Sequence, residues 1–506
     1  MSARRAGGRA ARRALRAAPL AEDARAVRPG MEGGRYRPLT DIQVDAIHRA
    51  VLRVLSEIGL SQAPDSGVEA MVAYGAVPKG DRLTFPEAVI EKALGDAPAA
   101  VTLHGRDPAH DLSVGGNRVH YGTAGAAVHV ADLETGEYRE STLADLHEAA
   151  RLADRLDNIH FFQRCMVARD LADPREMDVN TLYASVTGTL KHVGTSFTEA
   201  AFVRESVAML HMIAGGEAAW RARPFVSNSN CFVVPPLKFA TESCLVLEEV
   251  VRAGMPVLLL SAGQAGATSP APLAGSVMQA VAECLAGLVY VQALSPGAPA
   301  IFGTWPFVSD LRTGAMCGGS AEQALLTAAC AQMGRHYDLP TGAAGGMADA
   351  KFPAFQGGAE HGVTSVMAGL AGLNMVYESA GMYASLLGFS PEGMILDDDV
   401  LGQCLRCVRG IEVTDETLDV AAMAQICLEG PGHYLGSAQT LGLMQSEYFY
   451  PAASDRTSPK EWAERGKPDL VDTAKRRKAA LLAQPPRATL EPGLDAEIRA
   501  AFPIRL

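Results

Sequence analysis

Hydrophobic and polar positions follow two alternating patterns along the chain. Short apolar runs with strand character occur at residues 120–122, 159–166, 192–197, 224–231, 256–261, 300–303, 339–343 and 375–378. Longer segments with apolar residues at helical spacing occur at residues 143–156, 177–190, 200–213, 239–253, 274–294, 321–337, 356–373 and 391–408. Strand and helix alternate about eight times over roughly 290 residues, which predicts an α/β protein with a closed (β/α)8 barrel of the TIM type.

A doubly wound open sheet is the main alternative, because the same alternation builds both architectures. No G-x-G-x-x-G motif follows a strand, and eight repeats favour closure. We expect the barrel at residues 116–410, preceded by a disordered basic tail at 1–34 and by an extension of helices and strands packed on the barrel at 35–115. A C-terminal helical extension is expected at residues 411–506.

Composition narrows the class of protein. With 506 residues, 48% hydrophobic and 20% charged, the chain can bury a sizeable core, and its net charge of −12 argues against a nucleic-acid-binding protein. Nine cysteines scattered through apolar runs indicate reduced thiols, as in a cytoplasmic protein.

No segment reaches the roughly 18 uninterrupted apolar residues of a membrane helix, and the basic start lacks the apolar core of a secretory signal. That start is rich in arginine and alanine, so an organelle transit peptide is the alternative to a basic tail. We expect a homo-oligomer without membrane or nucleic-acid contacts.

Candidate site residues stand where the strands end, because the carboxyl ends of barrel strands converge on one cavity. Aromatic residues make up 6% of the chain but are dense at these ends: Tyr121, Phe302, Trp305, Phe352 and Tyr377. Aromatic faces attract a cation by roughly 0.5–2 kcal/mol per contact. Glu378 or Asp349 is the candidate catalytic group, supplying a countercharge. The alternative for Phe302 and Tyr377 is a place in the core of their apolar strands.

Other chemistries find weaker support. Cys404 and Cys407 form a C-x-x-C within a helical pattern, without the second pair of a zinc site. His120 is the one histidine clearly at a strand end, and no G-x-S-x-G motif is present. The glycine-rich residues 342–346 could hold phosphate, but no helix-start signature adjoins them. We therefore expect no metal site.

Several motifs together resemble the trimethylamine methyltransferase (MttB-like) family. They are residues 262–270 (AGQAGATSP), 282–287 (AECLAG), 318–322 (GGSAE), 349–351 (DAK) with Gln356 and Glu360, and 397–412. The likeness covers roughly residues 35–460. Two positions depart from the family pattern: Ala354, where an acidic residue is common, and His361, where lysine is usual.

The resemblance implies a (β/α)8 methyltransferase that passes a methyl group from a methylamine or betaine to the cobalt of a separate corrinoid protein. The chain itself would bind no cofactor. Family members acting on trimethylamine carry pyrrolysine, and this chain has only standard residues. When a quaternary amine gives up a methyl group, the leaving group is a neutral tertiary amine, and no acid is needed to protonate it. A glycine betaine-like substrate is therefore expected. Its carboxylate would be held by Arg164, Lys351 or Asn228. The alternatives are a barrel that binds such ligands without turnover and a metal-dependent hydrolase or lyase.

Overall fold

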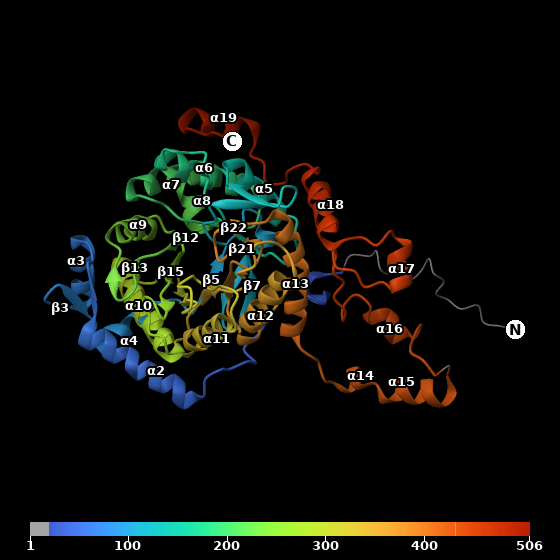
Figure 1. Cartoon of the computed structure of the whole chain (residues 1–506). Helices are drawn as coiled ribbons and strands as arrows, with labels where there is room; N and C mark the ends of the chain where they lie inside the picture. Colours follow the sequence, from blue (N-terminus) through green and yellow to red (C-terminus); the bar gives the residue numbers. More distant parts are fainter. Residues whose placement is uncertain (1–19, 431) are drawn as a thin grey trace.

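A closed barrel forms the centre of the computed structural model, which describes residues 20–430 and 432–506 (Figure 1). Its strands are β7 (Arg118–Tyr121), β10 (Phe161–Gln163), β11 (His192–Thr195), β12 (Val226–Asn230), β15 (Val257–Ser261), β17 (Ala300–Thr304), β19 (Gly342–Ala344) and β20 (Met375–Tyr377). All neighbours pair in parallel, and isolated bridges join β7 to β10 and β17 to β19. Strand β20 pairs with β7, so the circle closes. The predicted eight-stranded barrel is confirmed, and the open-sheet alternative is wrong.

One principal helix follows each strand and packs outside the barrel. These helices are α5 (Leu143–Ala153), α6 (Pro174–Gly188), α7 (Ala200–Ala214), α9 (Thr241–Arg252), α10 (Leu273–Leu294), α11 (Ala321–His336), α12 (Phe355–Ala371) and α13 (Pro391–Arg409), with a short α8 (Glu217–Ala222) after α7. Local sequence fixes several ends. Thr142 caps α5 with a reciprocal capping box, and Gly372 ends α12 in the left-handed conformation.

Helix α10 connects the barrel with the N-terminal extension. In the described part of the chain it is the one helix long and apolar enough to cross a membrane, but 83% of its most apolar window is buried inside the fold. It contacts β15 and β17 on one side and the extension helices on the other (Figure 1). Its apolar character is therefore that of a core helix.

The N-terminal extension consists of α2 (Asp41–Arg53), η2 (Val54–Ile58), β2 (Leu60–Ser61), α3 (Asp65–Tyr74), β3 (Val77–Lys79), β4 (Arg82–Thr84), α4 (Glu87–Asp96), β5 (Ala100–Leu103), η3 (Pro108–His110) and β6 (Leu112–Gly115). Strands β2 to β4 form a sheet with β13 (Val233–Val234) and β14 (Lys238–Phe239). The β5–β6 hairpin joins the N-terminal side of the barrel. There His120 and His192 hydrogen-bond Ser113 O at 3.0 Å and His104 O at 2.8 Å.

The expected disordered tail needs a correction. Residues 1–19 lie outside the described residues, but the chain after them is structured, with η1 (Glu22–Ala24) and β1 (Met31–Glu32). Strand β1 pairs antiparallel with β7, and the Met31 side chain is buried. An apolar residue that can cover the first barrel strand thus orders the chain before residue 35.

Loops beyond the strand ends carry further short strands. The loops after β7 and β20 share a four-stranded sheet made of β8 (His129–Asp132), β9 (Glu137–Glu140), β21 (Met382–Tyr383) and β22 (Gly388–Phe389). The loops after β15 and β17 share the pair β16 (Gln264–Ala265) and β18 (Phe307–Val308). These pairings fix neighbouring loops to each other around the mouth of the barrel.

The C-terminal extension contains α14 (Asp415–Leu418), α15 (Val420–Ala424), η4 (Gln425–Glu429), α16 (Ala438–Leu443), α17 (Pro459–Glu464), α18 (Leu470–Leu482) and α19 (Pro492–Ala501). Helix α18 packs on α13 and α5, and α19 packs on α7. Helices α14 to α16 instead extend away from the barrel (Figure 1).

Candidate active site

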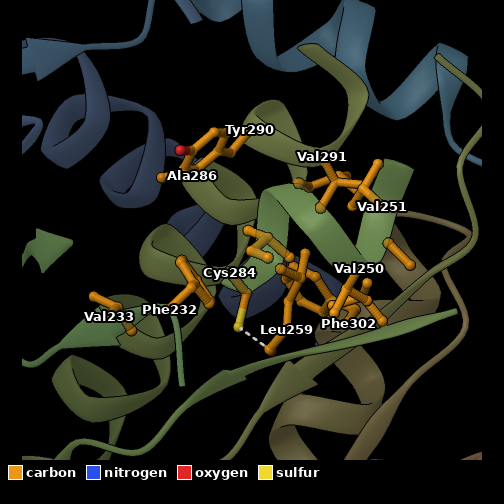
Figure 2. Close-up of a cluster of buried hydrophobic side chains, with 14 of the residues drawn as sticks. Phe232, Val233, Val250, Val251, Leu259, Cys284, Ala286, Tyr290, Val291 and Phe302 are labelled. Atoms are coloured by element: carbon orange, nitrogen blue, oxygen red, sulfur yellow. Dashed lines mark hydrogen bonds between the residues drawn. The ribbon is translucent and has the colours of Figure 1, made fainter. Parts of the chain in front are cut away.

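The alternation of side chains along each strand decides which residues face the barrel interior. A Cβ added at Gly342 would meet Tyr377, Leu258 and Ile301, so these three side chains converge inside the barrel. The next residue on each strand faces the helices instead. Figure 2 shows this outer layer, where Phe302 and Leu259 pack with side chains of α9 and α10 such as Val250 and Val291.

Three aromatic rings stack at the mouth end of the interior. The Trp305 and Tyr377 ring centroids lie 5.1 Å apart with an interplanar angle of 30°. Phe161 meets Tyr377 in a T-shaped contact, with ring centroids 5.0 Å apart. Trp305 follows directly after β17, and its Nε1 is close enough to the Glu378 carboxyl to influence it, although the geometry falls short of an ordinary hydrogen bond. The structure therefore brings two of the expected rings together and adds Phe161, which the sequence analysis did not single out.

Glu378 lies beside these rings. It is the first residue after β20, has a left-handed φ of 62° and is 4% exposed. Its Oε2 finds no hydrogen-bond partner in the described chain. Burial raises the pKa of Glu378 to about 8, an effect that the Trp305 indole N–H partly opposes. A non-glycine residue in this conformation with an unpaired buried carboxyl is the kind of strained position found at functional sites.

A cation stands at the end of another barrel strand. Arg164 is the first residue after β10, and its side chain has no hydrogen-bond or ion-pair partner among the residues that the structure describes. Desolvation lowers the pKa of the guanidinium, and Asp178 on α6 opposes this shift. The thiol of Cys231, the first residue after β12, lies within electrostatic range of both Arg164 and Glu378. Arg164 and Glu378 are therefore both near the end of β12.

Three expected residues face the helix layer instead. The Tyr121 hydroxyl donates to Ser365 O on α12 at 2.8 Å, and Phe302 meets Tyr337 at the end of α11 with centroids 6.0 Å apart. Asn228 is fully buried, and its amide lies 3.5 Å from Thr195 O on the neighbouring strand. We therefore correct the expectation that these residues line the mouth. Each occupies the outward phase of its strand.

Asp349, Lys351 and Phe352 belong to the loop after β19. The Asp349 carboxylate accepts the Gly318 N–H at 2.8 Å, the Cys317 thiol at 2.9 Å and the Ser385 hydroxyl. Lys351 Nζ donates to the Asp349 carbonyl at 2.6 Å, and the Phe352 ring packs 5.4 Å from Tyr138 of β9. These contacts tie three mouth loops together. Asp349 is engaged in holding them, so Glu378 is the acid that remains free for a ligand.

Two buried side chains fix the backbone just beyond Glu378. Asp397 Oδ2 accepts the Gly381 N–H at 2.7 Å, and its Oδ1 lies 2.5 Å from His361 Nδ1. His361 Nε2 lies 3.0 Å from Met382 O. Desolvation opposes protonation of His361, but the Asp397 carboxylate outweighs it, so the pKa of His361 is raised. His361 stands where lysine is usual in the family pattern, and the sequence alone assigns no function to that departure.

The titration of Glu378 gives the first prediction. In the unfolded chain this carboxyl loses its proton near pH 4.5, and in the folded protein near pH 8. Between these values the folded state binds more protons, so the free energy of unfolding falls as pH rises, by up to about 1.4 kcal/mol per pH unit. Urea unfolding at pH 5, 6.5 and 8 measures the free energy of unfolding. It should fall more steeply with pH in the wild type than in Glu378→Gln, which has no carboxyl to titrate at this position. Parallel pH profiles would contradict it.

No group of three or more histidine, cysteine, aspartate or glutamate side chains in the described ranges is placed to hold a metal ion. All nine cysteines are free thiols. The ligand-binding features of the site are therefore aromatic rings, one buried carboxyl and one unpaired guanidinium.

Comparisons with known proteins agree with this architecture. The model of the trimethylamine methyltransferase (MTTB) family matches residues 5–505. A glycine betaine methyltransferase of Desulfitobacterium hafniense (strain Y51) is 31% identical over 475 residues, covering 92% of this chain and 96% of that protein. The trimethylamine methyltransferase MttB of Methanosarcina thermophila is 30% identical, covering 88% of this chain and 92% of its own length. A crystal structure of a hydroxylamine MtmB complex aligns with a TM-score of 0.51 at 11% identity, over 91% of this chain and 90% of that one, and shows the shared fold.

Proposed function

The chain belongs to the trimethylamine methyltransferase (MTTB) family and is a methyltransferase, and we propose that it takes its methyl group from a quaternary amine that also carries a carboxylate. Glycine betaine is the simplest such compound. The acceptor in this proposal is the Co(I) corrinoid of a separate protein, in the cytoplasm. One observation carries the choice of substrate: an unpaired buried carboxyl and an unpaired guanidinium both lie near Cys231 at the strand ends, beside stacked aromatic rings.

The chemistry of the leaving group supports a substrate with permanent charge. When the bond from the methyl carbon to nitrogen breaks, its electron pair stays on nitrogen and a quaternary ammonium becomes a neutral tertiary amine. No proton donor is required for this step. The corrinoid supplies the nucleophile that attacks the methyl carbon. The task left to the protein is to orient the cation and exclude water around it.

The residues at the mouth suit this task. Trp305 and Tyr377 present ring faces to the methyl groups of the ammonium, and Glu378 supplies the opposite charge. A cation beside Glu378 favours its ionised form, so binding draws a proton off the carboxyl. Arg164 has the planar donor geometry that holds a carboxylate through two hydrogen bonds. Together these groups orient a zwitterion with its methylated end inside the barrel.

The rim of the mouth supports approach of a protein partner. Leu311 and Leu387 stand on loops that follow barrel strands, and Phe355 begins α12 after a third such loop; they are 70%, 59% and 93% exposed. Exposed apolar side chains near a site are typical of protein contact surfaces. A corrinoid carried by a protein would have to enter between these loops.

Methylation of cob(I)alamin, followed by its absorbance change, tests the proposal. We expect the wild type to use glycine betaine in preference to choline and tetramethylammonium, which lack a carboxylate. In Arg164→Met the kcat/KM for glycine betaine should fall roughly 10- to 100-fold, the effect of losing a charge-assisted hydrogen-bonded pair of about 1.5–3 kcal/mol. The value for tetramethylammonium should stay constant. If no quaternary amine methylated either free cob(I)alamin or the cobalt of a corrinoid protein, the proposal would be refuted.

Trp305→Ala gives a separate prediction for the ammonium group. Loss of the ring should weaken glycine betaine binding by roughly 2- to 30-fold, as expected for a cation–π contact of about 0.5–2 kcal/mol. Binding of 3,3-dimethylbutanoate, the analogue whose uncharged tert-butyl group replaces the trimethylammonium group, should change less. Calorimetry with both ligands on the wild type, Trp305→Ala and Trp305→Phe measures the difference. An equal loss for both ligands would show that the indole contributes packing alone.

A further inference from the structure

Cys231 is an exposed thiol between two buried neighbours. It follows β12 directly, and Asn230 before it and Phe232 after it are both buried. The Asn230 amide donates to Ser243 O of α9 at 3.0 Å, and Phe232 packs against Gly287 of α10, in the helix layer that Figure 2 shows. Both neighbours therefore face the helices. Because side chains alternate along an extended chain, Cys231 points to the other face, into the barrel.

The register of the barrel strands gives the same orientation. Ser229 of β12 pairs in parallel with Leu258 of β15, which pairs with Ile301 of β17. Leu258 and Ile301 are among the side chains that converge inside the barrel at Gly342. Paired residues of neighbouring strands share a face, and so do residues two positions apart on one strand. Cys231, two positions after Ser229, is therefore on the inward face.

The inward face becomes more exposed toward the mouth of the barrel. Leu258 is buried, whereas Leu260, the next inward residue of β15, is partly exposed. On β12 the partly exposed Ser229 is followed by the exposed Cys231. A barrel filled by side chains to its rim would bury all of these positions. Solvent therefore enters the mouth of the barrel and reaches the Cys231 thiol.

Two unpartnered charged groups lie near this thiol. Glu378 is almost fully buried, and its Oε2 has no hydrogen-bond partner in the described chain; the same is true of the buried Nε of Arg164. Burial raises the pKa of the Cys231 thiol, Arg164 opposes the rise and Glu378 adds to it. The thiol therefore keeps its proton at neutral pH. It adds no charge to the two that await a ligand.

We propose that Cys231 is part of the wall of the substrate pocket, and that its thiol contacts the bound quaternary amine. The identity of the ligand rests on the function proposed above. A protonated thiol is small, polarizable and a weak hydrogen-bonding group, so it can touch N-methyl groups without competing for Glu378. Bound substrate should then shield the thiol from reagents, and the size of the side chain at position 231 should limit what fits.

Alkylation of the full-length protein by iodoacetamide tests the shielding. In this reaction the sulfur displaces iodide and the thiol proton goes to the buffer. Cys407 and Cys427 are the other exposed thiols of the described chain, on α13 and η4, and serve as controls within the same molecule. Glycine betaine at ten times its Kd should slow alkylation of Cys231 by about tenfold, because only the free protein reacts. Peptide mass spectrometry should find the rates at Cys407 and Cys427 unchanged.

The outcomes of this experiment separate the two proposals. If glycine betaine binds in calorimetry but Cys231 reacts at the same rate, the thiol is not in the pocket and the proposed function stands. If glycine betaine neither binds nor methylates cob(I)alamin, the proposed function fails and the assignment of Cys231 fails with it. Equal slowing at all three thiols would show a general change in the protein and would also overturn the assignment.

A reagent that itself carries a quaternary ammonium gives a second test. The Cys231 thiolate attacks the sulfenyl sulfur of 2-(trimethylammonio)ethyl methanethiosulfonate, methanesulfinate leaves, and a disulfide tethers the ammonium to the protein. The labelled protein should lose glycine betaine binding, and dithiothreitol should restore it. In Cys231→Ala the same treatment still labels Cys407 and Cys427 and should leave binding as it was before treatment. Loss of binding in both proteins, or in neither, would contradict the proposal.

Cys231→Met tests the limit on size. The longer side chain should raise the KM for glycine betaine by roughly 5- to 100-fold, the effect of forcing extra atoms into a space that the substrate fills. Because position 231 faces solvent in the ligand-free protein, the thermal midpoint should stay close to that of the wild type. Cys407→Met, the matched control, should keep the KM within about twofold, as expected of a surface substitution. A Cys231→Met protein with the wild-type KM would overturn the assignment.

Discussion

Glu378→Gln is expected to lower kcat/KM for glycine betaine by roughly 10²–10³-fold at pH 8. The amide keeps the shape of the side chain but cannot become an anion, so a buried ammonium loses its opposite charge. Leaving one member of a buried charge pair alone costs about 3–5 kcal/mol, and the lower part of that range, about 3–4 kcal/mol, corresponds to this loss. The cob(I)alamin methylation assay measures it with saturating and limiting amine.

The environment of Glu378 explains why the effect should be large. The carboxyl is 4% exposed and lies beside the stacked Trp305 and Tyr377 rings, where water cannot replace the missing charge. Its pKa of about 8 in the ligand-free protein means that cation binding at neutral pH releases a proton. Calorimetry in two buffers of different ionisation enthalpy should detect that proton in the wild type and miss it in Glu378→Gln.

A matched control separates this role from a general effect of charge. Glu322 is an exposed acid in the first turn of α11, so Glu322→Gln removes the same charge from the surface. Its kcat/KM should stay within about twofold of the wild type, as expected of screened surface charges. If Glu378→Gln behaved like Glu322→Gln, Glu378 would have no part in holding the ammonium.

His361→Asn should lower the free energy of unfolding by about 3–5 kcal/mol. The variant leaves the Asp397 carboxylate, which is 2% exposed, without the imidazolium beside it. The two ring nitrogens of His361 face a carboxylate and a carbonyl, and both of these groups are hydrogen-bond acceptors. Both nitrogens must therefore carry a proton, which gives the ring a positive charge that asparagine lacks. Urea unfolding of the two proteins at pH 7 measures the difference.

The double variant His361→Asn/Asp397→Asn tests the cause. It removes the orphaned charge as well, so it should recover part of the stability that the single variant loses. Both variants loosen the Gly381–Met382 segment, and kcat should fall in each because Glu378 is three residues away. A single variant as stable as the wild type would show that His361 is not the cation of a buried pair.

The expected strands and helices were recoverable because they depend on local pattern. Segment 375–378, with apolar residues before a polar end, became β20 followed by Glu378, and segment 356–373 became α12. Trp305, Tyr377 and Glu378 were found in the same way, as the residues at strand ends. Cys231 occupies an equivalent place after β12, but it lies in an apolar run that gives it no polar signal. Phe161 begins β10, so a search of the strand ends does not find it.

The face of each strand could not be predicted in the same way. Phe302 and Trp305 are three residues apart on one chain segment, but one packs against α10 and α11 and the other against Tyr377. In a barrel strand both faces are buried, so hydrophobic pattern does not distinguish interior from helix layer. Tyr121 and Asn228 were misplaced for the same reason.

The sequence by itself determined the order of strands and helices, the eightfold repeat and the polar residues that end each strand, because these follow from local spacing and propensity. Only the tertiary structure decided that Asp349 ties three loops together while Glu378 stays unpaired, and that Arg164 shares a mouth with it. Those outcomes depend on the register of neighbouring strands and on contacts between residues far apart in the chain. Local spacing carries no information about either.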